Sequence, residues 1–209
     1  MPAYLRALEL GADAIELDVH ATRDGVVVVH HDPSFHAGRV PWMGKRAIDD
    51  LDFAEVREFM LADGIRVPSL GEVLEAVGDA AFVHVEIKAT NIEPLVVRCI
   101  RESTTPCAVH SFDHRVVQNV KKIFPAIRTG ILETARHVDP TASLVATGAN
   151  DLWQEVGSID EDLVARTHAA GARVVAWTSN DPAQWKTLSE MRVDAICTDR
   201  IGDLASFSY

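Results

Sequence analysis

The chain has 209 residues, of which 47% are hydrophobic and 24% are charged, and its formal net charge is -11. This length suffices for one sizeable core, so we expect a single domain over residues 1–209. The excess of acidic residues argues against nucleic-acid binding, which needs clustered Lys and Arg. No apolar run reaches the roughly 20 residues of a membrane span.

Short apolar runs alternate with amphipathic stretches along the whole chain. We predict strands at residues 14–19, 26–31, 82–88, 107–112, 127–132, 150–156, 173–179 and 194–199. Strands that alternate with helices at this spacing are typical of parallel β/α units. The fold class predicted from this pattern is therefore α/β.

Helix start and stop signals stand between several of these runs. A capping box is predicted twice, with a glycine that closes each helix: Ser69 with Glu72 before Gly78, and Ser158 with Glu161 before Gly171. Pro182, at a first helical position, predicts a third helix with Asn180 or Asp181 as its cap.

The first two strand runs are too close together for a helix, so we predict an antiparallel hairpin. Asp24-Gly25 is a strong tight-turn signal. If these two residues form the loop, facing positions sum to 49 and His31 lies opposite Asp18. A three-residue loop would place His30 there instead.

Acidic residues share one face of two separate strands. Period-2 alternation places Glu16 and Asp18 together, and it places His84, Glu86 and Lys88 together. In a parallel barrel the chemistry lies at the carboxyl ends of the strands, where these carboxylates would converge into a site for a hard cation. The alternatives are a solvated hairpin face and a Glu86–Lys88 ion pair within a barrel layer.

Six segments, in this order, resemble the glycerophosphodiester phosphodiesterase family: GADAIELDVHATRDGVVVVHHD, VPSLGEVL, VEIK, HSFD, VVAWTSN and DAICTD. The resemblance covers about Leu5 to Asp199. It implies a TIM-type (β/α) barrel with a short insertion at about residues 33–66. It also implies hydrolysis of a small-molecule glycerophosphodiester to glycerol 3-phosphate and an alcohol.

The resemblance further implies roles for individual residues. These are Glu16, Asp18 and Glu86 as metal ligands, His31 as an acid/base, Lys88 as a catalytic neighbour of the substrate phosphate, and Trp177 and Phe112 as substrate-binding aromatics. The implied cofactor is a divalent cation, Ca²⁺ or Mg²⁺, and both ions prefer carboxylate oxygens as ligands. Imidazole ordinarily titrates near neutral pH and can protonate a leaving alkoxide. For the two aromatic residues the alternative is plain core packing.

We expect structural roles for the remaining histidines. His20 should point into solvent and His84 should pack inside the barrel with a hydrogen bond. Helical or loop contexts without the spacing of a zinc site are expected for His110, His114, His137 and His168. Trp42 and Met43, in the insertion, should line the substrate entrance or cover the barrel mouth.

The chain departs from the family at its start. Family members open with a His-Arg-Gly strand and a Pro-Glu-Asn-Thr loop, which supply the first barrel strand, a second acid/base histidine and a phosphate-contacting arginine. This chain begins MPAYLRALELGADAIELDV, so seven of eight barrel strands are expected. The open edges at 14–19 and 194–199 would favour homo-oligomers. A longer natural chain, a degenerate protein or a strand supplied by a partner would explain the difference.

Three functional hypotheses follow. The first is a metal-dependent phosphodiesterase whose activity is impaired without the His-Arg-Gly strand. The second is a non-catalytic relative that binds a cation and a phosphate or polyol ligand. The third is a phospholipase D-like lyase, but such proteins normally secure their loops with disulfides. The cysteines at 99, 107 and 197 instead favour reduced thiols and a cytoplasmic location.

Overall fold

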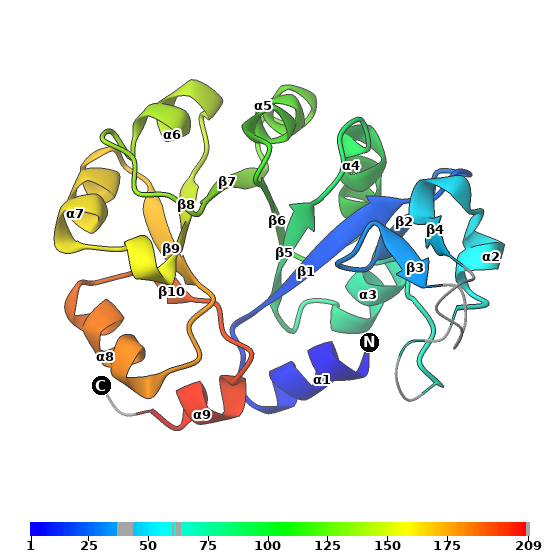
Figure 1. Cartoon of the computed structure of the whole chain (residues 1–209), viewed down its shortest axis with the longest axis horizontal. Coiled ribbons are helices and arrows are strands. Elements are labelled where there is room, and N and C mark those ends of the chain that lie inside the picture. Colours follow the sequence, from blue (N-terminus) through cyan, green and yellow to red (C-terminus); the bar gives the residue numbers. More distant parts are fainter. Residues whose placement is uncertain (37–43, 60, 62–63, 208–209) are drawn as a thin grey trace.

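The computed structural model describes residues 1–36, 44–59, 61 and 64–207. Its centre is an eight-stranded sheet in the order β10-β9-β8-β7-β6-β5-β1-β2, curled into an open barrel with helices around its outside (Figure 1). The prediction of a TIM-type (β/α) barrel that lacks one strand is confirmed. Trp42 and Met43 lie outside the described residues.

Seven strands of this sheet run parallel to their neighbours, and β2 pairs antiparallel with β1. The strands are β1 (Ala14–Ala21), β2 (Val27–Val29), β5 (Phe82–Ile87), β6 (Cys107–Ser111), β7 (Arg128–Glu133), β8 (Asp151–Glu155), β9 (Arg173–Trp177) and β10 (Ala195–Ile196), with β3 (Ser34–His36) and β4 (Lys45–Ala47) in a separate sheet. The helices are α1 (Pro2–Glu9), η2 (Ile48–Asp50), α2 (Phe53–Val56), α3 (Leu70–Val77), α4 (Glu93–Glu102), α5 (His114–Ile123), α6 (Ala142–Thr147), η4 (Val156–Ser158), α7 (Glu161–Ala169), α8 (Pro182–Glu190) and α9 (Ile201–Ala205).

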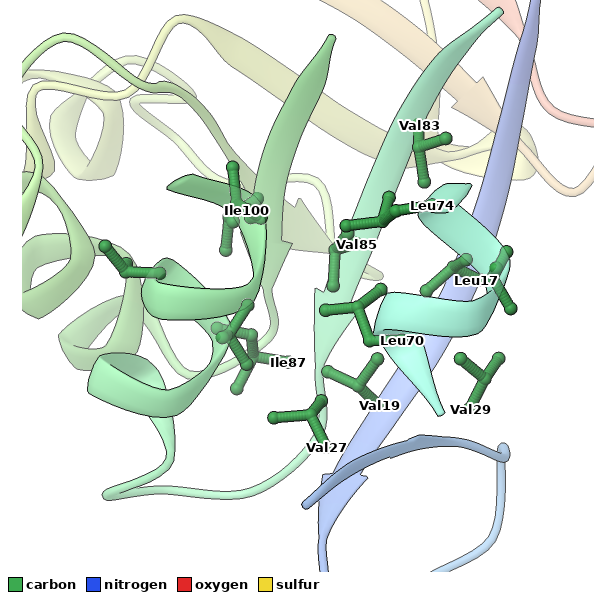
Figure 2. Packing of buried hydrophobic residues seen from close by; sticks show 14 of the residues in the cluster. Leu17, Val19, Val27, Val29, Leu70, Leu74, Val83, Val85, Ile87 and Ile100 are labelled. Carbon is green, nitrogen blue, oxygen red and sulfur yellow. The ribbon is translucent and has the colours of Figure 1, made fainter. Parts of the chain in front are cut away.

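The outer faces of β1 and β5 form the main apolar core. Alternation sends Ile15, Leu17 and Val19 of β1 outward, where all three are buried. Figure 2 shows Leu17 and Val19 beside Leu70 and Leu74 of α3, in the cluster that also contains the apolar residues of β5. Because this face carries the hydrophobic burial, the opposite face of β1 is free to carry Glu16 and Asp18 into the barrel interior.

A capping box starts α3, as predicted. Ser69 Oγ accepts a hydrogen bond from the backbone N–H of Glu72 at 3.1 Å, and the Glu72 carboxylate accepts one from the N–H of Ser69 at 2.8 Å. Gly78 ends the helix with a φ of +58°. Such a box satisfies two backbone donors that a helix start leaves unpaired.

Substitution of Ser69 by Ala is expected to lower the free energy of unfolding by about 1 kcal/mol, because the helix loses its cap. Urea denaturation followed by circular dichroism measures this change. Ser189→Ala is the matched control, since Ser189 lies inside α8, is also half-buried and caps nothing. Equal losses in the two variants would contradict the prediction.

The capping box predicted at Ser158 is wrong. The cap of α7 is Asp160, whose carboxylate accepts a hydrogen bond from the N–H of Leu163 at 2.7 Å. Ser158 ends the 3₁₀ turn η4 and its hydroxyl donates to the carbonyl of Thr134, so it is not available as a cap. At α8, Asp181 rather than Asn180 is the cap.

Of the two loop lengths considered for the hairpin between β1 and β2, the structure has the three-residue loop. The Thr22 hydroxyl binds the Asp24 carboxylate and the N–H of Val26, which closes the loop around residues 23–25. Gly25 takes a φ of +79°, the left-handed conformation that such loops require. Facing positions therefore sum to 48, as in Val19 opposite Val29, and the N–H of His30 donates to the carbonyl of Asp18 at 3.0 Å.

The barrel is open between β1 and β10. β10 pairs only with β9 among the described strands, and β1 meets β2 only from Val19 onward. A cleft of about 500 Å³ lies between these edges, lined by residues of α1, β1, β10 and α9, and α1 and α9 pass across the open side (Figure 1). None of the described helices combines the length and apolarity that crossing a bilayer requires.

Candidate active site

A pocket of about 330 Å³ lies inside the barrel, toward the carboxyl ends of its strands. It brings together every site residue that the sequence predicts: Glu16, Asp18, His31, Glu86, Lys88, Phe112 and Trp177. These residues come from β1, β5, β9 and the segments that follow β2, β5 and β6. The fold therefore gathers in one pocket side chains that are up to 161 positions apart, from 16 to 177.

Strand register places two of the carboxylates next to each other. Asp18 on β1 and Glu86 on β5 are register partners in a parallel pair. Lys88 Nζ contacts both, at 3.0 Å from Asp18 Oδ1 and 2.7 Å from Glu86 Oε1. Burial works against the Lys88 ammonium, but its hydrogen bonds to the two carboxylates raise its pKa overall. One lysine thus neutralises part of the negative charge of this cluster.

Glu16 lies one position deeper on the same face of β1 and has no ion pair with Lys88. Burial raises its pKa to about 8, and the negative charge of Asp18 adds to this shift. Burial also raises the pKa of Glu86, which Lys88 partly offsets. A group of carboxylates in this environment is costly to ionise without a cation, so the pocket favours a bound positive charge.

His31 lines the pocket from the segment after β2, not from a position opposite Asp18. His30 takes that position in the backbone, but its ring packs on Phe35 with 4.6 Å between ring centroids. The side chain of His31 is 72% exposed, and its Nδ1 lies 2.9 Å from Asp32 Oδ1. The hydrogen bond from His31 lowers the pKa of the Asp32 carboxyl.

His20 does not point into solvent, which corrects the prediction for this residue. It lies within β1 and is buried, and its Nε2 is 3.2 Å from the carbonyl oxygen of His31. Burial lowers the pKa of His20. A neutral His20 with Nε2 protonated donates to this carbonyl and so helps to hold the His31 backbone in place.

Two aromatic side chains stand at the mouth of the pocket. Phe112 and Trp177 pack edge to face, with 5.4 Å between ring centroids and an interplanar angle of 83°. Phe112 is 45% exposed, and Lys88 Nζ lies 5.8 Å from the centre of its ring. Phe112 is exposed and Trp177 is half-buried, and an aromatic pair of this kind beside a charged pocket provides an apolar surface for part of a small ligand.

His110 also lines the pocket, and it lies in a strand and not in the predicted helical or loop context. It lies inside β6 as the register partner of Glu86, and its Nε2 is 3.4 Å from Glu16 Oε1. Burial lowers the pKa of His110 to about 4, so the imidazole is neutral. The alternation of residues 107–112 contained the signal, since it places position 110 on one face with 108 and 112.

His84 lies inside the barrel as predicted, but its Nδ1 does not make the hydrogen bond expected of this side chain. This buried atom has no hydrogen-bond partner in the described part of the chain. Its ring contacts Phe82 and Trp153, each with 5.0 Å between ring centroids. Burial lowers the pKa of His84 to about 3, so it stays neutral at physiological pH.

Gly130 makes room for the ring that packs on His110. The Trp153 indole stacks on the His110 imidazole, with ring centroids 4.3 Å apart and planes 8° from parallel. A Cβ at Gly130 would lie 2.8 Å from Trp153 Cδ1 and 3.3 Å from His110 Cβ, closer than atoms normally pack. The glycine is therefore required by the Trp153 ring and not by backbone conformation.

Gly130→Ala is expected to lower the free energy of unfolding by about 1–3 kcal/mol, because the added methyl displaces the Trp153 ring. Urea denaturation monitored by tryptophan fluorescence reports both the stability and the environment of the indole. Gly71→Ala serves as the control, because a Cβ there meets only a Ser69 hydroxyl at 3.9 Å and alanine favours the helix. Unchanged stability of Gly130→Ala would contradict this packing argument.

The polar groups of the pocket fit a divalent cation. One ligand atom each from Glu16, Glu86 and His110 lie within 4.8 Å of one another. Asp18 is not part of this compact group and is paired with Lys88. Carboxylate oxygens and a neutral imidazole are common ligands of divalent metals, so these residues could hold such an ion.

The chain matches known proteins along nearly its whole length. The model of the "Glycerophosphoryl diester phosphodiesterase family" matches residues 1–203. A glycerophosphodiester phosphodiesterase of Caldanaerobacter subterraneus is 31% identical over 94% of this chain and 86% of that protein. A Mycobacterium tuberculosis protein, named probable glycerophosphodiester phosphodiesterase 2, is 35% identical over 96% of this chain and 81% of that protein.

A solved structure has the same fold. It is an Oleispira antarctica phosphodiesterase in complex with the product sn-glycerol-3-phosphate, and it superimposes with a TM-score of 0.85 at 21% identity. The match covers 98% of this chain and 87% of that chain. The pocket, the family match and the curated relatives agree, and the chain belongs to the glycerophosphoryl diester phosphodiesterase family, whose members are hydrolases.

Proposed function

We propose that this chain hydrolyses glycerophosphodiesters to glycerol 3-phosphate and an alcohol. The observation that carries the proposal is the convergence of three carboxylates, Lys88 and His31 in one pocket of a family member. The related Oleispira antarctica phosphodiesterase binds the product sn-glycerol-3-phosphate on the same fold. The three free cysteines fit a cytoplasmic location, since thiols persist in reducing compartments.

Glu16, Asp18 and Glu86 would hold a divalent cation. Carboxylate ligands alone would favour Ca²⁺ or Mg²⁺. When bound, such an ion neutralises charge that develops on phosphate oxygens during displacement. The three carboxylates supply a formal charge that Lys88 only partly balances. The excess negative charge of the pocket and its oxygen donors therefore both favour a bound cation.

His31 would act as the general acid. Its Nδ1–H donates to Asp32, which orients the ring and leaves Nε2 to carry the proton for the leaving alkoxide. Its high exposure suits contact with a substrate that enters from solvent. His20, which binds the His31 carbonyl, would keep the ring over the pocket.

Lys88 and the aromatic pair would bind the two parts of the substrate. The Lys88 ammonium contacts the Asp18 carboxylate and lies 5.8 Å from the centre of the Phe112 ring, where it would pair with a phosphate oxygen. Phe112 and Trp177 offer an apolar surface to the glycerol carbons. The phosphate would then sit between Lys88 and His31.

The test is release of glycerol 3-phosphate from glycerophosphocholine and glycerophosphoethanolamine, with each divalent cation in turn. His31→Ala is expected to lower kcat by about 10²–10⁴-fold, because it removes the general acid. His137→Ala is the control, because the His137 side chain is also exposed, at 49% against 72% for His31, and is paired with a carboxylate, but it lies outside the pocket. Cation binding without turnover in the wild-type chain would overturn the proposal and identify a binding protein.

A further inference from the structure

His110 is a buried polar group that the proposed reaction does not use. The residue is 1% exposed. Its Nε2 lies 3.4 Å from Glu16 Oε1 without the geometry of a hydrogen bond, and neither ring nitrogen is hydrogen-bonded to any of the described residues. Buried polar side chains in folded proteins almost always have a partner, because an unpaired one loses its hydration without return. An orphaned imidazole that faces a carboxylate cluster indicates a partner that the chain itself does not supply.

The imidazole is held rigidly in this orientation. Trp153 stacks on one of its faces, and Gly130 lets the indole lie there. Parallel register fixes the His110 backbone beside that of Glu86. A metal-binding ring that packing and register already orient does not need to be ordered again when the ion binds.

The spacing of the donor atoms suits a single ion. His110 Nε2 lies 3.4 Å from Glu16 Oε1, and the donors of Glu16, Glu86 and His110 lie within 4.8 Å of one another. Ligands bound at about 2.0–2.2 Å lie roughly 3 Å apart when adjacent and roughly 4 Å apart when opposite. Small side-chain rotations would therefore close the group around an ion.

We propose that His110 supplies a nitrogen ligand to the divalent cation, beside Glu16 and Glu86, and that the site consequently favours Zn²⁺ and other nitrogen-binding ions over Ca²⁺. The inference rests on the proposed function in one respect, because the cation is the one proposed there. Carboxylate and water ligands suit Ca²⁺ and Mg²⁺, whereas imidazole shifts the preference toward later transition ions. The carboxylates alone would favour Ca²⁺ or Mg²⁺, and the His110 nitrogen shifts this preference toward Zn²⁺.

Pulsed electron paramagnetic resonance of the full chain loaded with Mn²⁺ tests the ligand directly. A bound imidazole gives a ¹⁴N modulation, which selective ¹⁵N-histidine labelling of the wild-type protein should change to a ¹⁵N pattern. We expect the modulation to disappear in His110→Gln and to remain in His84→Gln and His31→Ala. His84 is the matched control, because its ring also lies inside the barrel, 6.1 Å from that of His110. Absence of nitrogen coupling in the wild type, or its loss in His31→Ala instead, would overturn the proposal.

Calorimetry of Zn²⁺ and Ca²⁺ binding tests the selectivity. His110→Gln is expected to weaken Zn²⁺ binding at least about tenfold and Ca²⁺ binding less than about threefold. Equal weakening of both ions would assign His110 a structural role and overturn the proposal. Hydrolysis is measured in parallel, so that wild-type turnover without nitrogen coupling removes the nitrogen ligand and leaves the phosphodiesterase function intact.

Discussion

Glu86→Gln is expected to abolish measurable divalent-cation binding and to lower kcat/KM for glycerophosphodiester hydrolysis at least about 10³-fold. The change keeps the size of the side chain and removes its charge. Glu86 is central in the pocket, because it is the register partner of both Asp18 and His110 and contacts Lys88 at 2.7 Å. A loss of 10³-fold corresponds to about 4 kcal/mol of transition-state stabilisation, within the range expected for a metal and its electrostatic effect.

The control for this experiment is Glu93→Gln. Glu93 is 3% exposed, compared with 6% for Glu86, so burial is matched. Its carboxylate accepts a hydrogen bond from Asn119 on α5, and it does not line the pocket. Cation titration and initial-rate kinetics on the two variants separate loss of the site from loss of the fold. Activity of Glu86→Gln within about threefold of wild type would refute the proposed site.

Asp151→Asn is expected to reduce the free energy of unfolding by about 2–4 kcal/mol. The carboxylate is fully buried at the start of β8, and it accepts hydrogen bonds from Arg128 Nε at 2.7 Å and from Arg173 Nε at 2.9 Å. An amide there would direct N–H groups at guanidinium donors. The side chains of both arginines are a third or more exposed, so water partly solvates their charges. The expected loss of stability is therefore smaller than the roughly 3–5 kcal/mol typical of breaking a fully buried ion pair.

The loss should depend on pH in a defined direction. Burial opposes ionisation of Asp151, but hydrogen bonds from both arginines hold its pKa below the ordinary value of 3.8. The carboxylate therefore stabilises the fold above that value, and the stabilisation disappears as the pH falls through the lowered pKa of the folded state. Denaturation of wild type and Asp151→Asn should differ fully at pH 5–8 and converge in stronger acid.

Asp162→Asn is the matched comparison on the surface. Asp162 also pairs with an arginine, at 2.7 Å from Arg136, but its side chain is mostly exposed. Exposed ion pairs contribute less than about 1 kcal/mol, so this variant should remain close to wild type. Similar stability losses at the two aspartates would show that burial is not what makes Asp151 important.

The strands were predictable from the sequence because each is an apolar run of strand length with marked boundaries. The hairpin register was not, because a Thr hydroxyl that binds both Asp24 and the N–H of Val26 closes a three-residue loop, and either loop length fits the Asp24-Gly25 signal. A register difference of one residue moves every facing pair. His31 lines the pocket all the same, because it follows the end of β2 and is not placed by the pairing.

His110 shows why a site assembled from neighbouring strands is hard to find by spacing along the chain. Zinc motifs place ligands a few residues apart on one segment, whereas Glu16, Glu86 and His110 come from three strands. Only the strand order makes them neighbours. Packing details such as the Trp153 ring over Gly130 depend on three-dimensional contacts and leave no local pattern.

Strand register sets Asp18, Glu86 and His110 side by side on β1, β5 and β6. As a result, changes in the loops can occur without changes in the polar centre of the pocket. Adjacent strands are held roughly 4.8 Å apart by backbone hydrogen bonds, so the distances among these three side chains are anchored in the scaffold. Insertions in the connecting loops can reshape the entrance and alter which head group is accepted, while the polar centre keeps its dimensions. Diversification of substrate range and preservation of the chemistry are thus assigned to different parts of the same barrel.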